Sequence, residues 1–249
     1  MIPKIIHYCW LSDDPYPQKI QKCLDSWHRV LPDYEFRLWN FDRFPKDKSM
    51  WVSQAFDSKK YAFAADYIRN YALYTEGGIY LDTDVEVVKS FDPLLHLPYF
   101  MGMESTTDDI EAAVMGSEAG NPVFKAMLDY YNNRSFIRTD GTFRTTPLPQ
   151  LMSQRLFGLY KIQPIAGISD FKTDEDTLCV FPSDYFSPIH LQTMRLRITD
   201  NTYAIHRFAA SWRPASHRYK KELQILLGPT ITSAIVSAKH FIKEVLRFD

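Results

Sequence analysis

The sequence has few cysteines, no long apolar run and almost no net charge, and each of these absences excludes a class of protein. Three of the 249 residues are cysteines (Cys9, Cys23 and Cys179), and no C-x-x-C pair occurs. A disulfide framework or a zinc site is therefore not expected, whereas a reducing compartment is. The formal net charge is −1, so nothing in the composition indicates nucleic acid or another polyanion as a partner.

Signals for membrane insertion and secretion are also lacking. No stretch reaches the roughly 18 apolar residues of a membrane span, and residues 1–7 contain no apolar signal-peptide core. We therefore expect a cytoplasmic protein. Hydrophobic residues make up 45% of the chain, which is enough for a packed core domain over residues 1–228. Residues 229–249 are expected to form an appended amphipathic helix.

The order of the expected elements favours an α/β fold. We predict strands at residues 5–10, 34–39, 79–88, 178–181 and 202–206, and helices at residues 17–29, 57–76, 121–131 and 150–159. Gly77 and Gly78 should end the second helix, because glycine tolerates a left-handed backbone. Strands that alternate with helices predict a largely parallel sheet, and ligands bind beyond the carboxyl ends of the strands in such sheets.

Two aspartates, Asp82 and Asp84, follow the apolar residues Ile79 to Leu81. Alternate residues of a strand point to the same face, so the two carboxylates should converge and repel each other unless a cation joins them. Oxygen ligands suit Mg²⁺ or Mn²⁺, and such an ion can neutralise a departing diphosphate. The alternative is a solvated turn, because the D-x-D pattern alone is common.

A charged pair precedes this motif on a predicted helix. Asp66 and Arg69 are three residues apart and share one helix face. They form either a surface ion pair or a site for sugar and phosphate or ribose oxygens, which arginine binds with two nitrogens. His7 follows two apolar residues and is expected to be a hydrogen-bonded core histidine.

These residues stand in a recognisable pattern. Residues 64–69 (AADYIR) and 74–84 (YTEGGIYLDTD) resemble the D-x-x-R … GG-x-Y-x-D-x-D signature of the family 32 glycosyltransferases. That family includes yeast-type initiating mannosyltransferases and capsular polysaccharide transferases, and the glucosylating domains of large clostridial toxins share the signature. Residues 2–10 (IPKIIHYCW) resemble the family's N-terminal strand, and residues 206–212 (HRFAASW) resemble its C-terminal H-x-x-x-x-S-W element.

The resemblance implies a GT-A fold, with a Rossmann-like, mostly parallel central sheet flanked by helices. It implies transfer of a sugar with retention of anomeric configuration, as in the synthesis of capsular or other glycans, with Mn²⁺ or Mg²⁺ as the cofactor. The donor would be a nucleotide-sugar, a UDP-sugar in preference to a GDP-sugar. The acceptor would be a saccharide or a lipid-linked glycan.

The resemblance also implies residue roles. Asp84 and His206 would bind the metal, with Asp82 in contact with the ribose or a metal-bound water, and Asp66 and Arg69 would hold the donor sugar. The catalytic residues would be Asp82, Asp84, Asp66 and Arg69. The nucleotide-sugar would contact Tyr8, Trp10, Asp66, Arg69, Tyr80, Asp82, Ser211 and Trp212, with Trp10 stacked on the base and Ser211 and Trp212 at the diphosphate.

The acceptor side departs from the family pattern. The family's Thr-Gly-Pro segment has its nearest match here in Thr145-Thr146-Pro147, which lacks the glycine. The acidic residues Asp108, Asp109 and Glu111 are interpreted as a solvated loop, with contact to the acceptor or the reactive sugar as the alternative. The helix at residues 229–249 either docks on the domain or lies on an anionic membrane.

Two other functions fit parts of the sequence. A phosphotransferase of the haloacid dehalogenase type would use Asp82 as nucleophile and Asp84 as acid and base. This function leaves the segment from His206 to Trp212 unexplained. A non-catalytic carbohydrate-binding protein on a degenerate transferase fold is the other alternative, and the intact acidic motif weighs against it.

Overall fold

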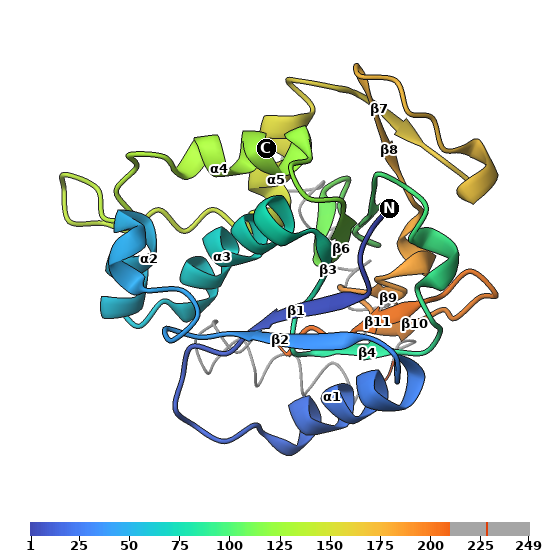
Figure 1. The fold of residues 1–249 in the computed structure, drawn as a ribbon, viewed down its shortest axis with the longest axis horizontal. Coiled ribbons are helices and arrows are strands. Elements are labelled where there is room, and N and C mark those ends of the chain that lie inside the picture. Colours follow the sequence, from blue (N-terminus) through green and yellow to red (C-terminus); the bar gives the residue numbers. More distant parts are fainter. Residues whose placement is uncertain (210–227, 229–249) are drawn as a thin grey trace, which may run out of the picture.

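A mixed sheet forms the centre of the molecule (Figure 1). The computed structural model describes residues 1–209 and residue 228. Within this part, five strands pair in the order β2-β1-β3-β6-β5. Their bounds are β1 Ile5–Cys9, β2 Glu35–Trp39, β3 Gly78–Leu81, β5 Tyr99–Met103 and β6 Ile110–Ser117. Strand β1 pairs in parallel with β2 and β3, whereas β6 runs antiparallel to β3 and β5. Only β6 is reversed among these strands, so the prediction of an α/β fold with a mostly parallel sheet is confirmed.

Helices cover both faces of this sheet (Figure 1). Helix α1 contacts β4 (Val85–Val87) on one side, while α3 contacts β1, β3 and β6 and packs against α2 and α4 on the other. The bounds are α1 Gln18–Val30, α2 Met50–Asp57, α3 Tyr61–Glu76, α4 Pro122–Tyr131 and α5 Leu148–Leu156. The expected helices are present within a few residues of their predicted ends, whereas α2, β5 and β6 were not predicted.

Short strand pairs complete the described fold. Strand β4 (Val85–Val87) pairs antiparallel with β11 (Ala204–His206), β7 (Lys161–Pro164) pairs in parallel with β8 (Thr177–Val180), and β9 (Ile189–His190) pairs antiparallel with β10 (Arg195–Leu196). The first pair matters most for function, because it brings a late segment of the chain beside the early D-x-D motif.

Each face of the sheet has its own hydrophobic core. Along β3, Tyr80 joins the cluster on the α3 side, and its neighbours Ile79 and Leu81 join the cluster that contains Trp27 of α1. This is the alternation expected of a strand that is buried on both faces. Strand β3 is therefore fixed from both sides just before its carboxyl end.

The junction between α3 and β3 depends on two glycines. The N–H of Gly77 donates to the carbonyl of Leu73 at 3.1 Å, and Gly77 and Gly78 have φ values of 65° and 101°. A Cβ at Gly78 would lie 2.8 Å from the carbonyl oxygen of Ile5 and 2.9 Å from Nε2 of His7. The prediction that these glycines end the helix is confirmed, and Gly78 also permits close contact with β1.

His7 is a core histidine, as predicted. Its side chain is fully buried, its Nε2 donates to the carbonyl of Gly77 at 2.6 Å, and its Nδ1 accepts from the indole N–H of Trp39 at 3.0 Å. Burial lowers the pKa of His7 to about 4. This histidine is neutral at physiological pH and supports the strand junction.

Two further expectations concern the whole chain. All three cysteines are free, as predicted. No helix within the described residues is long and apolar enough to cross a bilayer. The predicted helix at residues 229–249, and with it the boundary at residue 228, lies outside the part of the chain that the structure describes.

We expect the substitution Gly78→Ala to lower the free energy of unfolding by about 2–4 kcal/mol. A side chain at this left-handed position costs about 1–2 kcal/mol, and overlap with the backbone of β1 adds a similar amount. Urea unfolding followed by circular dichroism measures the change. The matched control is Gly158→Ala, where the nearest atom lies 3.7 Å from the added Cβ. An equal effect of both substitutions would contradict the close approach at Gly78.

Candidate active site

The D-x-D motif lies in a turn between β3 and β4. The carbonyl of Asp82 accepts from the N–H of Val85 at 3.0 Å, and the N–H of Asp82 donates to the carbonyl of Ala113 at 2.9 Å. The prediction of one continuous strand over residues 79–88 is therefore wrong, and so is the argument that strand alternation aligns the two carboxylates. The tight turn brings them together instead.

Three potential metal ligands converge at this turn. Each of Asp82, Asp84 and His206 offers one ligand atom, and these atoms lie within 4.8 Å of one another. The Nε2 of His206 is 3.5 Å from Oδ1 of Asp84. Two ligands about 2.1 Å from one ion and at right angles would be roughly 3 Å apart, so this spacing suits a shared divalent cation. The predicted proximity of Asp84 and His206 is confirmed, and their role in metal binding stays a prediction.

The β4–β11 ladder is what brings His206 to the turn. His206 lies opposite Val85 in this ladder, directly beside the D-x-D motif. The backbone of Asp84 accepts from the N–H of Arg207 at 2.9 Å, and its side-chain Oδ2 accepts from the N–H of Ala209 at 2.6 Å. The two segments are thus joined by the ladder and, just beyond it, by two hydrogen bonds from backbone N–H groups to Asp84.

Arg69 is the hub of the charged cluster. Its Nη1 lies 3.2 Å from Oδ2 of Asp82, and its Nη2 lies 3.1 Å from Oδ1 of Asp82 and 3.2 Å from Oδ1 of Asp66. Its Nη1 also donates to the carbonyl of Ala112 at 2.7 Å. Arg69 is 5% exposed and Asp66 7% exposed. The interpretation of a surface ion pair is therefore wrong, because the pair is buried and shared with the D-x-D motif.

Tyr80 reaches the same cluster from β3. Its ring lies 4.6 Å from the guanidinium carbon of Arg69, and its hydroxyl donates to Oδ1 of Asp82 at 3.1 Å. Tyr80 is 1% exposed, so its visible contribution is to support Arg69 and Asp82 from within the core. Its predicted place beside the nucleotide stays a prediction.

Burial shifts the ionisation of these groups. Burial raises the pKa of Asp66 to about 7, against the opposing effect of the Arg69 guanidinium, and the charge of Asp82 raises it further. Burial likewise raises the pKa of Asp82. Burial disfavours the charge of Arg69, but the nearby carboxylates raise its pKa well above the usual value. The guanidinium therefore remains charged and offsets part of the negative charge around it.

A fourth acidic residue, Glu111 of β6, belongs to the site. It is 1% exposed, and its Oε2 is 3.2 Å from Nδ1 of His206. The interpretation of Asp108, Asp109 and Glu111 as a solvated loop holds for the exposed Asp108 but is wrong for Glu111. The physical reason is that β6 is buried along its whole length and carries Glu111 inward.

Glu104, which follows β5, is a further acidic group near this site. Its Oε2 accepts a hydrogen bond from Thr107 at 2.8 Å. Burial raises the pKa of Glu104 to about 7, and the charge of Glu111 adds to this effect. Nothing in the sequence marked Glu104 as a neighbour of the site.

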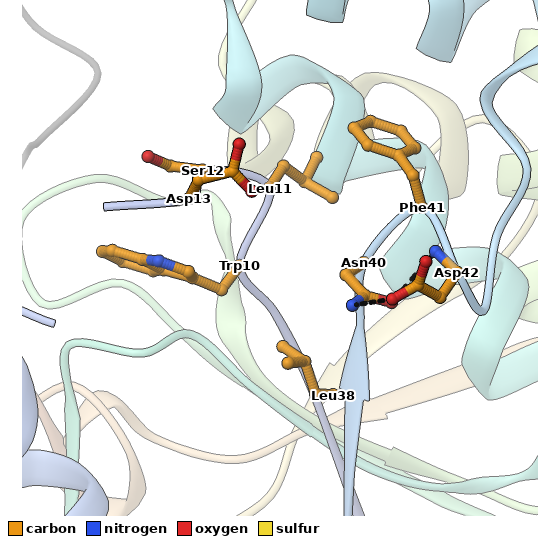
Figure 2. Close-up of a pocket in the computed structure, with 8 residues that line it drawn as sticks. All are labelled: Trp10, Leu11, Ser12, Asp13, Leu38, Asn40, Phe41 and Asp42. Atoms are coloured by element: carbon orange, nitrogen blue, oxygen red, sulfur yellow. Dashed lines mark hydrogen bonds between the residues drawn. The ribbon is translucent and has the colours of Figure 1, made fainter. Parts of the chain in front are cut away.

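A pocket of about 210 Å³ opens beyond the carboxyl ends of β1 and β2 (Figure 2). The Trp10 indole lies on one side of it, and Asn40 and Asp42, joined by a 3.0 Å hydrogen bond, lie on the other. The full lining is Trp10, Leu11, Ser12, Asp13, Leu38, Asn40, Phe41 and Asp42. Because β1 pairs in parallel with both β2 and β3, the pocket and the D-x-D turn occupy the same edge of the sheet. An aromatic face with a few polar groups suits a small planar ligand.

Tyr8, Ser211 and Trp212 were also predicted to contact the nucleotide. Tyr8 does not line this pocket and packs edge-on against Trp27, with ring centroids 5.4 Å apart. Ser211 and Trp212 lie outside the part of the chain that the structure describes. Trp10, the residue predicted to stack on the base, lines this pocket.

Four of the charged residues of this site lie in one segment that matches a known protein family. Residues 17–101 match the family described as the glycosyltransferase sugar-binding region containing the DXD motif. The matched segment includes Asp66, Arg69, Asp82 and Asp84. This segment of the chain is therefore similar to the sugar-binding region of DXD glycosyltransferases. A mostly parallel sheet with the D-x-D turn at the end of a central strand agrees with the GT-A assignment.

Two named relatives align with this chain over different lengths. This chain is 38% identical over 125 residues to inositol phosphoceramide mannosyltransferase 3 of Schizosaccharomyces pombe. The aligned residues make up 49% of this chain and 35% of that protein. The chain thus spans little more than a third of that relative. It is also 26% identical over 228 residues to the uncharacterized glycosyltransferase L373 of Acanthamoeba polyphaga mimivirus, covering 86% of this chain and 85% of that protein.

A solved structure with a similar arrangement is the PaToxG glycosyltransferase. The superposition has a TM-score of 0.47 at 19% sequence identity and covers 63% of this chain and 69% of that one.

We expect Arg69→Met to lower the free energy of unfolding by about 3–5 kcal/mol, because the substitution leaves the buried carboxylates of Asp66 and Asp82 without their counter-charge. The double variant Asp66→Asn/Arg69→Met should recover part of this loss. Urea unfolding measures both. The control is the exposed Arg138→Met, which should change stability by less than about 0.5 kcal/mol. Similar small effects at both arginines would show that Arg69 is not the hub described here.

Proposed function

We propose that the protein is a metal-assisted, retaining glycosyltransferase. It moves a hexose or N-acetylhexosamine from a UDP- or GDP-sugar to a saccharide or lipid-linked acceptor. The observation that carries this proposal is the convergence of His206 on Asp82 and Asp84, two residues of the segment that matches a glycosyltransferase sugar-binding region. A family match alone would not distinguish an active enzyme from a degenerate one, whereas an assembled ligand set supports the active form.

The donor set and its charge fit a divalent cation. Four carboxylates gather around the Arg69 guanidinium and the His206 imidazole, which leaves the cluster with an excess of negative charge; the carboxylates are those of Asp66, Asp82, Asp84 and Glu111. An imidazole nitrogen among the ligands favours Mn²⁺ over Mg²⁺, which strongly prefers oxygen. The bound cation would neutralise the diphosphate as it leaves.

The rest of the site suits a nucleotide-sugar laid along one edge of the sheet. The base would enter the pocket beside Trp10 and stack on its indole. The diphosphate would reach the D-x-D turn, two strands away from β2 in the sheet order. Asp66, held by Arg69, would accept hydrogen bonds from hydroxyls of the donor sugar. Pre-organised groups of this kind stabilise charge in the transition state without reorganising during the reaction.

We further propose that the reaction proceeds on one face of the donor sugar. The acceptor oxygen forms the new bond to the anomeric carbon while the bond to the phosphate oxygen breaks, and the departing phosphate oxygen takes the acceptor's proton. Asp82 is poorly suited to be a nucleophile, because both of its oxygens lie within 3.2 Å of Arg69 nitrogens. The same contact weighs against the haloacid dehalogenase alternative, in which Asp82 attacks phosphorus.

The names of the relatives direct the choice of substrates to be tested. The fission-yeast relative is named for the transfer of mannose to inositol phosphoceramide. We therefore include GDP-mannose with the UDP-sugars as candidate donors, and glycolipids with free saccharides as candidate acceptors. The donor can be identified first, because hydrolysis of a nucleotide-sugar can be measured without an acceptor.

We expect the protein to hydrolyse at least one nucleotide-sugar of a panel slowly in the presence of Mn²⁺. The hydrolysis should stop when a chelator removes the metal. Asp84→Asn should lower this turnover by roughly 100-fold or more, because a metal-binding carboxylate at the leaving group is lost. Nucleotide release measured by chromatography follows the reaction. The exposed Asp108→Asn is the matched control and should leave the rate unchanged. Full turnover by a folded Asp84→Asn protein would show that the metal assignment is wrong.

A further inference from the structure

The Glu111 carboxylate has defined hydrogen-bond partners but no role in the reaction proposed above. Its carboxylate lies between two partners: Oε1 is 2.8 Å from the backbone nitrogen of Ala113, and Oε2 is 3.2 Å from Nδ1 of His206. The residue is 1% exposed. A buried carboxylate is costly unless it is paired and hydrogen-bonded, so this placement calls for a physical explanation.

The local backbone directs Glu111 to this position. Glu111 pairs with Gly102 of β5, but the next pair along the ladder joins Met115 to Met101, so the register shifts between them. The residues between Glu111 and Met115 form an irregularity of the ladder. Such irregularities re-aim side chains next to active sites. Here the irregularity accompanies a side chain that contacts His206 of the distant strand β11.

The two partners of the Glu111 carboxylate differ in whether they can only donate a hydrogen bond. The backbone N–H of Ala113 can only donate, so Oε1 must accept from it. An ionised carboxylate can only accept, so the contact at Oε2 requires a proton on Nδ1 of His206. A neutral imidazole with its proton on Nδ1 keeps its lone pair on Nε2. That nitrogen is the one that faces Asp84, at 3.5 Å from Oδ1.

We propose that Glu111 is a positioning residue that holds His206 in the tautomer with the proton on Nδ1 and thereby presents the Nε2 lone pair to the divalent cation. The inference rests on the proposed metal-assisted function. It assigns Glu111 a role through His206, without contact to the cation or the substrate. Groups that hold a metal-binding histidine in this way typically account for 10–100-fold in metal affinity.

An amide cannot replace the carboxylate in this role. Glu111→Gln keeps the shape of the side chain but has one acceptor oxygen in place of two. If that oxygen accepts from Ala113, the amide NH₂ faces His206 and favours the tautomer with the proton on Nε2. If the oxygen instead serves His206, the NH₂ meets the N–H of Ala113 and a backbone donor is left unpaired.

We test this with Mn²⁺ affinity, measured by isothermal titration calorimetry on the full chain. Glu111→Gln should bind Mn²⁺ about 10–100-fold more weakly than the parent protein. The control is Glu104→Gln, which removes the nearby charge of Glu104 but no contact to His206 that the structure describes; its affinity should stay within about threefold. An equal loss in both variants would assign the effect to charge and overturn the inference.

A second measurement on the unsubstituted protein keeps the inference testable if Glu111→Gln fails to fold. Two-dimensional ¹⁵N NMR of histidine-labelled, metal-free protein, at a pH where His206 is neutral, reports which ring nitrogen carries the proton. We expect the proton on Nδ1, and a proton on Nε2 would overturn the inference. The absence of Mn²⁺ binding by the parent protein would instead contradict the proposed function, so the two failures are distinguishable.

Discussion

The rest of the site depends on one buried guanidinium. Arg69 contacts both oxygens of Asp82, one oxygen of Asp66 and the carbonyl of Ala112, and it is 5% exposed. Without this charge, the carboxylates of the cluster would repel one another in a setting of low polarity. Arg69 compensates only part of the negative charge, and the remainder is what a divalent cation and the Asp84–His206 pair are suited to share. Arg69 thus both stabilises the buried carboxylates and sets the charge that remains for a cation.

The second constraint is topological. The candidate ligands come from segments more than a hundred residues apart, and the short β4–β11 ladder holds them together at the end of β3. The glycine junction before β3 and the close packing of both faces of that strand leave little freedom at the D-x-D turn. A ligand set fixed by backbone hydrogen bonds requires little rearrangement when a cation binds, which favours affinity and a defined geometry.

The sequence predicts the parts of this site that have local signals. Apolar periodicity and the glycine pair locate α3 and β3, and the resemblance brings His206 to the D-x-D motif in advance of any structure. Strand alternation was the wrong reason for the convergence of Asp82 and Asp84, because the chain turns at residue 82 and the contact of Asp82 with β6 is non-local. Glu111 was missed because it follows two aspartates and looks like part of a solvated loop, whereas its partner His206 is 95 residues away. Residues whose role depends on a distant partner leave no periodic pattern to detect.

The proposed function depends on Asp84 and His206 binding one cation together. Pulsed electron paramagnetic resonance of bound Mn²⁺ tests it most directly, because a coordinated imidazole nitrogen modulates the electron spin echo. We expect a coupling from one histidine nitrogen in the parent protein, its loss in His206→Gln and its persistence in the buried-core variant His7→Gln. A Mn²⁺ signal with no histidine coupling, or a coupling that survives in His206→Gln, would contradict shared binding of the cation by Asp84 and His206.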